Sequence, residues 1–173
     1  EDDDLIAKSI AMAIKDEGHF CDICNTAEEG LSAASEGDFD AIILDINLPD
    51  GDGFQVAKTI WRLNLPVPVL VVSGRASATD KVAALPSGAD GYLTKPFDRQ
   101  ELAANLNAIV RRANGHANSR IVTGPIVVDL LRHEVLVGTE RMNLTSKEYH
   151  IMELLSIRKG STLTKAHFIN HLY

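Results

Sequence analysis

The chain has 173 residues, of which 45% are hydrophobic, and this is enough for the packed core of one or two globular domains. It lacks an apolar run of about 18 residues and a basic-then-apolar N-terminal segment, so the sequence predicts a soluble, cytoplasmic protein without a membrane partner. The net charge of −7 is unevenly spread: residues 1–112 hold 10 Lys and Arg against 19 Asp and Glu, and the remainder holds 7 against 5. The second part could bind nucleic acid, provided that its cations cluster on one face.

Residues 1–112 alternate helical patterns with short apolar runs, which predicts an α/β fold with a doubly wound parallel sheet. A helix near residues 4–16 has Ile6, Ile10, Ala13 and Ile14 on one stripe. Residues 18–26 are interpreted as a short strand, and buried strands are predicted at 39–44, 67–72 and 91–94. Three capping boxes predict the starts of further helices: Thr26 with Glu29, Ser77 with Asp80, and Asp98 with Glu101.

The two cysteines form the pattern Cys21-Asp22-Ile23-Cys24, which is typical of redox and metal sites. On a strand, however, residues three apart point to opposite faces, whereas a redox pair lies at a helix N-terminus. With no second cysteine pair for zinc, the structural interpretation is favoured.

Residues 113–120 are small and polar, and we interpret them as a linker. The chain then changes character, with short β-like runs at 126–128 and 134–137 before a fourth capping box formed by Thr145 and Glu148. This order predicts a small α+β domain of strands followed by a helix. His167 and His171 have the spacing of two metal ligands on a helix, but no third ligand is evident.

Three predicted strands of the first part each end at a polar residue: Asp45, Ser73 and Lys95. Because ligands bind at the carboxyl ends of parallel strands, we expect these residues to converge. The acidic run Glu1 to Asp4 could join them, although alone it is also typical of a solvated helix start. Together they would serve phosphoryl transfer, with Asp45 as nucleophile, carboxylates for Mg²⁺, and Lys95 and Ser73 bound to phosphoryl oxygens.

Three segments carry a family resemblance: 43–53 around Asp45, 73–75 beginning at Ser73, and 88–97 around Lys95. In order, spacing and strand context they resemble the response-regulator receiver domain, over residues 1 to about 112. The resemblance implies that Glu1 and Asp2 form an acidic pair. It further implies that Asp2, Asp45 and the backbone carbonyl of Asn47 are ligands of a Mg²⁺ cofactor.

The same resemblance implies a cis peptide between Lys95 and Pro96, and a switch pair formed by Ser73 and Tyr92. It also implies that the first, central strand of the receiver precedes Glu1 and is missing from this sequence. Phosphoryl groups would come from a histidine kinase or a histidine phosphotransferase.

Residues 121–173 resemble the N-terminal part of the winged-helix DNA-binding domain of the OmpR/PhoB subfamily, chiefly through Leu144 to Tyr149. Promoter DNA is therefore an expected partner. The helix and wing that read DNA would follow Tyr173, so no base-contacting residue can be named.

A homodimer through the face made by the fourth helix, fifth strand and fifth helix is typical of the subfamily. Here Lys81 and Glu101 match one of its charged pairs, but uncharged residues stand at other positions of that face: Pro86, Gly91, Asn105 and Asn107. We expect that dimerisation driven by phosphorylation is weak through this surface, or that another surface serves.

Two other functions use part of the same set of residues. Phosphatases of the haloacid dehalogenase type carry a second Asp two residues after the nucleophile, and this Asp acts as a general acid. Here that position is Asn47, which cannot donate a proton as an acid does. The chain is therefore not expected to be an enzyme acting on external substrates. It is expected to lose its own phosphoryl group slowly. A scaffold that is never phosphorylated is disfavoured by the complete set of site residues.

Overall fold

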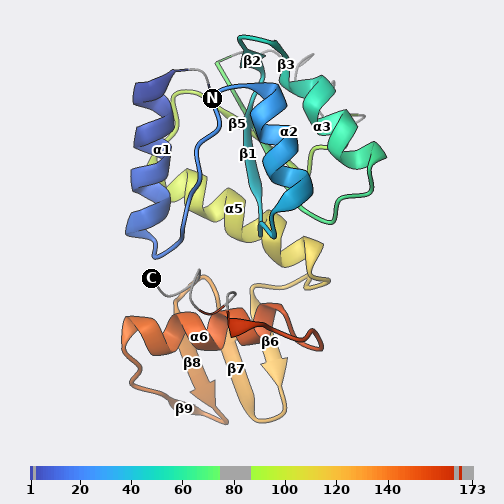
Figure 1. Cartoon of the computed structure of the whole chain (residues 1–173). Helices are drawn as coiled ribbons and strands as arrows, with labels where there is room; N and C mark the ends of the chain where they lie inside the picture. The colour runs from blue at the N-terminus through green and yellow to red at the C-terminus, as the bar shows by residue number, and fades with distance from the viewer. Residues whose placement is uncertain (2, 75–86, 166–167, 169–173) are drawn as a thin grey trace.

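The computed structural model describes residues 1, 3–74, 87–165 and 168. Figure 1 shows an α/β region above a smaller region with an antiparallel sheet. Within the described part of the chain, no helix is long and apolar enough to cross a membrane.

The first region contains a parallel sheet in the order β1-β4-β5, as the alternating pattern predicts. Its strands are β1 (Ile42–Asp45), β4 (Val69–Ser73) and β5 (Gly91–Thr94). Its helices are α1 (Asp4–Asp16), α2 (Ala27–Glu36), α3 (Gly53–Arg62) and α5 (Arg99–Ala113). A two-stranded hairpin of β2 (Asn47–Leu48) and β3 (Gly51–Asp52) follows β1.

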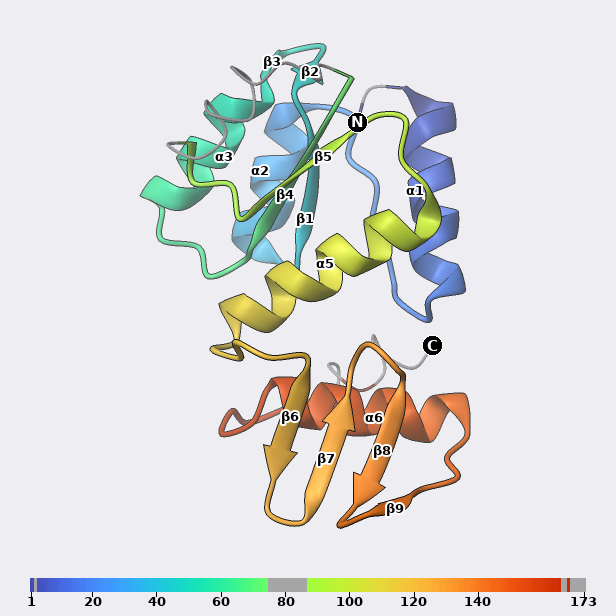
Figure 2. The ribbon, with the colours of Figure 1, turned by 180° about the vertical axis from the view of Figure 1, so that it is seen from behind.

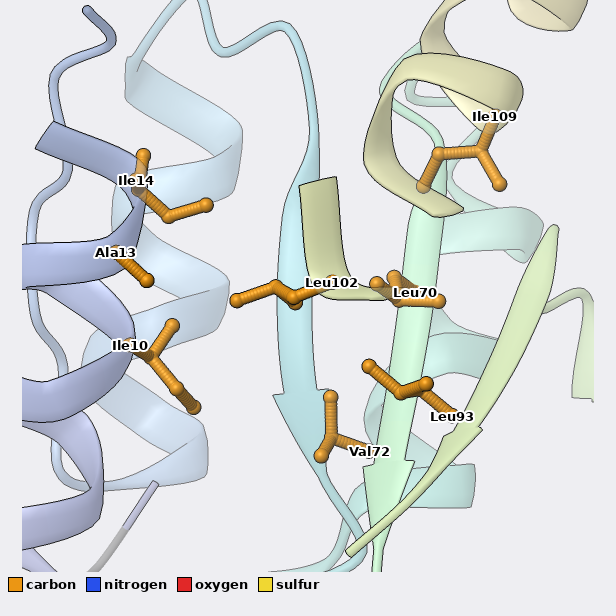
Figure 3. Close-up of a cluster of buried hydrophobic side chains, with 8 residues drawn as sticks. All are labelled: Ile10, Ala13, Ile14, Leu70, Val72, Leu93, Leu102 and Ile109. Carbon is orange, nitrogen blue, oxygen red and sulfur yellow. The ribbon is translucent and has the colours of Figure 1, made fainter. Parts of the chain in front are cut away.

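Both faces of this sheet are buried, because successive residues of β4 pack against opposite helical layers. Leu70 and Val72 join the cluster formed with α1 and α5 (Figure 3), whereas Val69 and Val71 join the one formed with α3. Gly91 in β5 is needed for this packing, since a Cβ there would lie 2.9 Å from Leu70 Cδ1. The doubly wound arrangement is visible from both sides (Figures 1 and 2).

The strand predicted at residues 18–26 was wrong, because residues 19–24 have no strand assignment. A strand requires a hydrogen-bonded neighbour, but a cavity of about 740 Å³ extends between this segment, α1 and the open edge of β1. Ile10, Ile14 and Leu44 are among its lining residues. The first strand expected to precede Glu1 stays a prediction.

The second region has four antiparallel strands in the order β6-β7-β8-β9, followed by α6 (Ser146–Ile157). The strands are β6 (Arg120–Thr123), β7 (Ile126–Asp129), β8 (Glu134–Val137) and β9 (Glu140–Arg141). Ile121, Val128 and Val135 face Tyr149 of α6 in a core of their own. Thr145 and Glu148 form the predicted capping box at the start of α6.

The two regions meet through α6 and the end of the sheet where the parallel strands begin. Arg158 Nη2 donates to Asp40 Oδ1 at 2.5 Å, and the Arg158 side chain is only 18% exposed. The rings of His19 and His150 have their centroids 6.3 Å apart. Burial first, and then the neighbouring His150, lower the pKa of His19.

Candidate functional site

The parallel register brings the predicted strand-end residues to one edge of the sheet. Asp45 pairs with Val72 at the end of β1, and Ser73 pairs with Thr94 at the end of β4. The side chains of Asp45 and Ser73 are nearly excluded from solvent, at 5% and 0% exposure. Burial of a carboxylate requires a partner, and the structure supplies one.

Lys95 is that partner. Its Nζ lies 3.1 Å from Asp45 Oδ2 and 2.7 Å from Glu1 Oε2, so one ammonium joins two carboxylates that are 44 residues apart in the chain. Burial alone would lower the pKa of Lys95, but hydrogen bonds and charges of Glu1 and Asp45 outweigh it, and the pKa is raised. Lys95 is therefore held as a cation at neutral pH.

The chain around Lys95 is fixed by two backbone features. Its N–H donates to the carbonyl of Ser73 at 2.7 Å, which ties the end of β5 to the end of β4. The Lys95–Pro96 peptide is cis, as the family resemblance predicts.

Asp45 presents its two carboxylate oxygens to different groups. Oδ2 faces the ammonium of Lys95, and Oδ1 accepts a 2.7 Å hydrogen bond from the backbone N–H of Ile46. Lys95 Nζ is a cationic donor able to bind an anion that arrives at Asp45. The arrangement suits a nucleophilic carboxylate that acquires a charged group.

Gly53 permits the close approach of α3 to Asp45. A Cβ at this position would collide with the backbone carbonyl of Asp45, and the Gly53 N–H donates to the carbonyl of Ile46 at 2.8 Å. The β2–β3 hairpin, which carries Asn47, is therefore closed tightly onto the end of β1. Asp52 completes the turn as the N-cap of α3, accepting from the N–H of Phe54 at 2.9 Å.

The oxygen donors near Lys95 fit a hard cation such as Mg²⁺, which prefers carboxylate and carbonyl oxygens. Glu1 and Asp45 are brought together by their shared ammonium, and Asn47 lies two residues beyond Asp45. Asp2 lies outside the described residues. Among the residues that are described, no three acidic, histidine or cysteine side chains form a metal cluster.

The remaining predicted residues are distributed as follows. Tyr92 is partly buried in β5 and packs against the cluster that includes Leu44. Glu101 lies in the first turn of α5, where its N–H is capped by Asp98 at 2.7 Å. The described residues do not include Ser77, Asp80, Lys81, Pro86, His167 and His171.

Cys21 and Cys24 are both free thiols. Burial raises the pKa of each thiol, and the nearby carboxylates Asp22 and Glu29 add to the effect. A raised pKa keeps a thiol protonated and unreactive, which agrees with the structural interpretation of this pair.

Asp50 is a site-associated residue that sequence reasoning missed. It lies between β2 and β3, and its carboxylate accepts from the N–H groups of Ala27 and Glu28 at 2.8 and 3.1 Å. The Pro49-Asp50-Gly51 sequence predicts only a turn, because no local pattern reveals a contact with a helix more than 20 residues away.

Three arginines of the second region are paired with carboxylates. Arg120 pairs with Asp129 at 3.3 Å, Arg141 pairs with Glu134 at 3.1 Å, and Arg158 pairs with Asp40. These three arginines stabilise the sheet or join the two regions.

Comparisons with known proteins agree with this geometry. The family model described as "Response regulator receiver domain" matches residues 1–107. The whole chain is 48% identical to the "Cell cycle response regulator CtrA" of Brucella ovis and spans 75% of that protein. Short segments of the sequence, such as Asn114-Gly115-His116, resemble the same regulator.

Two solved structures extend the comparison. DrrB, an OmpR/PhoB homologue of Thermotoga maritima, covers 100% of this chain and 77% of its own, with a TM-score of 0.59 and 23% identity, which shows the fold alone. A response regulator from Burkholderia pseudomallei, solved with a phosphorylated aspartic acid and a calcium ion, has a TM-score of 0.58 and 25% identity. It covers 66% of this chain and 68% of its own.

These regulators take part in two-component signalling rather than in the turnover of external substrates. With its parallel sheet, its strand-end carboxylate and a family match over residues 1–107, the chain belongs to the response-regulator receiver family and is a CtrA-like transcription regulator.

Proposed function

We propose that Asp45 accepts a phosphoryl group from a phosphohistidine of a histidine kinase or histidine phosphotransferase. One observation carries the proposal: Lys95 Nζ lies 3.1 Å from the buried carboxylate of Asp45 and 2.7 Å from Glu1. The similar response regulator from Burkholderia pseudomallei, which was solved with a phosphorylated aspartic acid, supports it.

In the proposed transfer, a carboxylate oxygen of Asp45 attacks phosphorus while the bond from phosphorus to the donor imidazole breaks. The electron pair of that bond returns to the imidazole nitrogen. Lys95 binds one phosphoryl oxygen through its ammonium, and the Ser73 hydroxyl donates to another. The buried position of Asp45 limits access of water to the product.

Glu1, Asp2, Asp45 and the main-chain carbonyl of Asn47 would hold Mg²⁺. When bound, this ion supplies positive charge that reduces repulsion between the carboxylate and the phosphoryl oxygens. The residue two positions after the nucleophile is Asn47, which has no acidic proton for a leaving group. The site therefore favours self-phosphorylation over hydrolysis of external phosphate esters.

The output is proposed to be promoter binding. Residues 1–112 would be the receiver, 113–120 the linker, and 121–173 the N-terminal part of a winged-helix domain. The fold likeness to DrrB over the whole chain and the identity with CtrA support this division. Phosphorylation would shift Ser73 and Tyr92 between two arrangements and so change DNA binding.

The phosphorylation test is incubation with a small phosphodonor and Mg²⁺, followed by intact mass measurement. We expect one phosphate adduct on the wild type and none on Asp45→Asn. An adduct on both proteins, or on neither when both are folded, would overturn the proposal. DNA binding by the natural full-length protein across a salt series would then test the output.

Dimerisation through Lys81 and Glu101 is proposed to be weak. On the α5 side of this face, Asn105 uses its amide locally, donating to the backbone carbonyl of Glu101 at 2.8 Å. Sedimentation of the phosphorylated protein should show mostly monomer. A tight dimer that is lost on Glu101→Lys would contradict this expectation.

A further inference from the structure

Asp50 joins two pieces of the receiver that flank the proposed cation site. It occupies the tip of the β2–β3 hairpin, which begins two residues after Asp45 and carries Asn47. From there its Oδ1 accepts from Ala27 N–H at 2.8 Å and its Oδ2 from Glu28 N–H at 3.1 Å. The two N–H groups open helix α2, so the carboxylate fastens the hairpin to that helix.

The rest of the α2 N-terminus is satisfied from its own segment. The Thr26 hydroxyl accepts from Glu29 N–H at 3.2 Å, and the Thr26 carbonyl accepts from Gly30 N–H at 3.1 Å. Thr26 and Asp50 therefore cap the same helix in different ways. Thr26 caps it locally, whereas Asp50 caps it from a different part of the chain.

The segment before α2 also contacts the acidic N-terminal residues. The nitrogen of Glu1 lies 3.4 Å from the carbonyl of Cys24, and the Asn25 amide donates to Asp4 Oδ1 at 3.5 Å. The start of α2 is thus held to the acidic run on one side and, through Asp50, to the hairpin on the other.

These contacts form a continuous frame around the nucleophile. The frame runs from Glu1 through Cys24 and α2 to Asp50, and then along the hairpin to Asn47. Two of the proposed oxygen donors, the Glu1 carboxylate and the Asn47 carbonyl, sit at its two ends. The Asp50 contacts thus add a link to α2 to the chain connections that the hairpin has with β1 and α3.

We propose that Asp50 is a positioning residue for the cation site. Its carboxylate bridges the hairpin to the α2 N-terminus and so sets the separation between the Asn47 carbonyl and the acidic residues at the N-terminal end. The inference rests on the proposed function, because it takes these groups as the Mg²⁺ donors. Residues that orient metal ligands typically change metal affinity by 10- to 100-fold when they are removed.

The test compares Asp50→Ala with Thr26→Ala in the natural full-length protein. Both variants remove a cap from α2, but only Asp50→Ala releases the hairpin. Calorimetric titration of the unphosphorylated proteins with MgCl₂ should show an affinity about tenfold or more weaker for Asp50→Ala. Thr26→Ala should bind within about twofold of the wild type.

A second measurement separates positioning from general damage. With a small phosphodonor, Asp50→Ala should need more Mg²⁺ for half-maximal phosphorylation, yet reach a rate near that of the wild type at saturation. Asp50→Asn keeps one acceptor oxygen and should give an intermediate Mg²⁺ affinity. If Asp50→Ala does not fold, Asp50→Asn provides the test.

Equal Mg²⁺ affinities for the Asp50 variants and Thr26→Ala, with the wild type binding Mg²⁺ and becoming phosphorylated, would overturn this inference and leave the proposed function intact. A wild type that binds no Mg²⁺ and takes up no phosphate would overturn both.

Discussion

In the receiver, the side chains that meet at the edge of the parallel sheet come from residues that are distant in sequence. In the antiparallel sheet of the second region, paired side chains come from strands that are adjacent in sequence. Lys95 joins Asp45 and Glu1 across separations of 50 and 94 residues. Arg141 instead pairs with Glu134 on the adjacent strand of a meander. Parallel topology gathers reactive groups at one edge, while the antiparallel meander uses its charges mainly for local stability.

Two buried acids, one from each region, differ in their partners. Asp45 is 5% exposed and is paired with an ammonium. Glu153 in α6 is 4% exposed, and its side chain is met only by the Tyr149 hydroxyl, at 3.4 Å, among the contacts defined for the described residues. Burial raises the pKa of Glu153 to about 7. Of these two acids, only Asp45 is matched with a cation.

Removing the cation of the receiver site should have the largest effect. Lys95→Ala is expected to lower the rate of phosphorylation by a small phosphodonor about 10²- to 10³-fold, the usual cost of losing a donor aimed at developing negative charge. The rate is measured from intact mass against time. Lys8→Ala removes an exposed lysine whose partner is Asp4 and should leave the rate unchanged. A Lys95→Ala rate within threefold of the wild type would contradict the role given to the ammonium.

The next effect concerns Glu153. Because its folded pKa is raised from 4.5 to about 7, the folded state binds the extra proton, and stability is lost as pH rises through that window. Glu153→Gln should therefore be more stable than the wild type at pH 8, by up to about 3 kcal/mol. The gain should disappear below pH 4.5. Urea unfolding of both proteins at several pH values measures it.

Glu148→Gln in the same helix is the matched control with the opposite sign. Hydrogen bonds from the Thr145 backbone N–H and hydroxyl lower the pKa of Glu148, so its contribution is present above 4.5 and lost as pH falls. This variant should be less stable than the wild type at pH 8. If Glu153→Gln were also less stable than the wild type at pH 8, the raised pKa of Glu153 would be contradicted.

A smaller loss is expected from Gly53→Ala. The new Cβ would meet the rigid backbone carbonyl of Asp45, so we expect a loss of about 2 kcal/mol in the free energy of unfolding. Gly124→Ala is the comparison from the second region: a Cβ there would have no atom within 4 Å, but the φ of +59° costs about 1 kcal/mol. Equal losses would indicate that α3 can move away from Asp45.

The smallest effect tests the contact between the two regions. Arg158→Ala and Asp40→Ala should each lower stability, and their double-mutant cycle should give a coupling energy of about 1 kcal/mol. The same cycle for Arg141 and Glu134, where the arginine is 65% exposed, should give about half as much or less. No coupling between Arg158 and Asp40 would mean that α6 is not held by this ion pair in solution.

The sequence by itself determined the local features of this protein. The helix over residues 4–16, the caps by Thr26, Asp98 and Thr145, and the alternation of strands and helices follow from periodicity and from short-range hydrogen bonds. The convergence of Asp45 and Lys95 was also predictable, because strand ends meet at one edge of a parallel sheet.

The tertiary structure alone decided what depends on distant partners. Residues 18–26 have the composition of a strand, but no strand among the described residues pairs with residues 19–24. The contact of Asp50 with α2, the closeness of Gly53 to Asp45, and the pairing of Arg158 with Asp40 each join residues or groups brought together by folding. Local patterns report intrinsic conformational preference, whereas these contacts exist only once the sheet and its helices have packed.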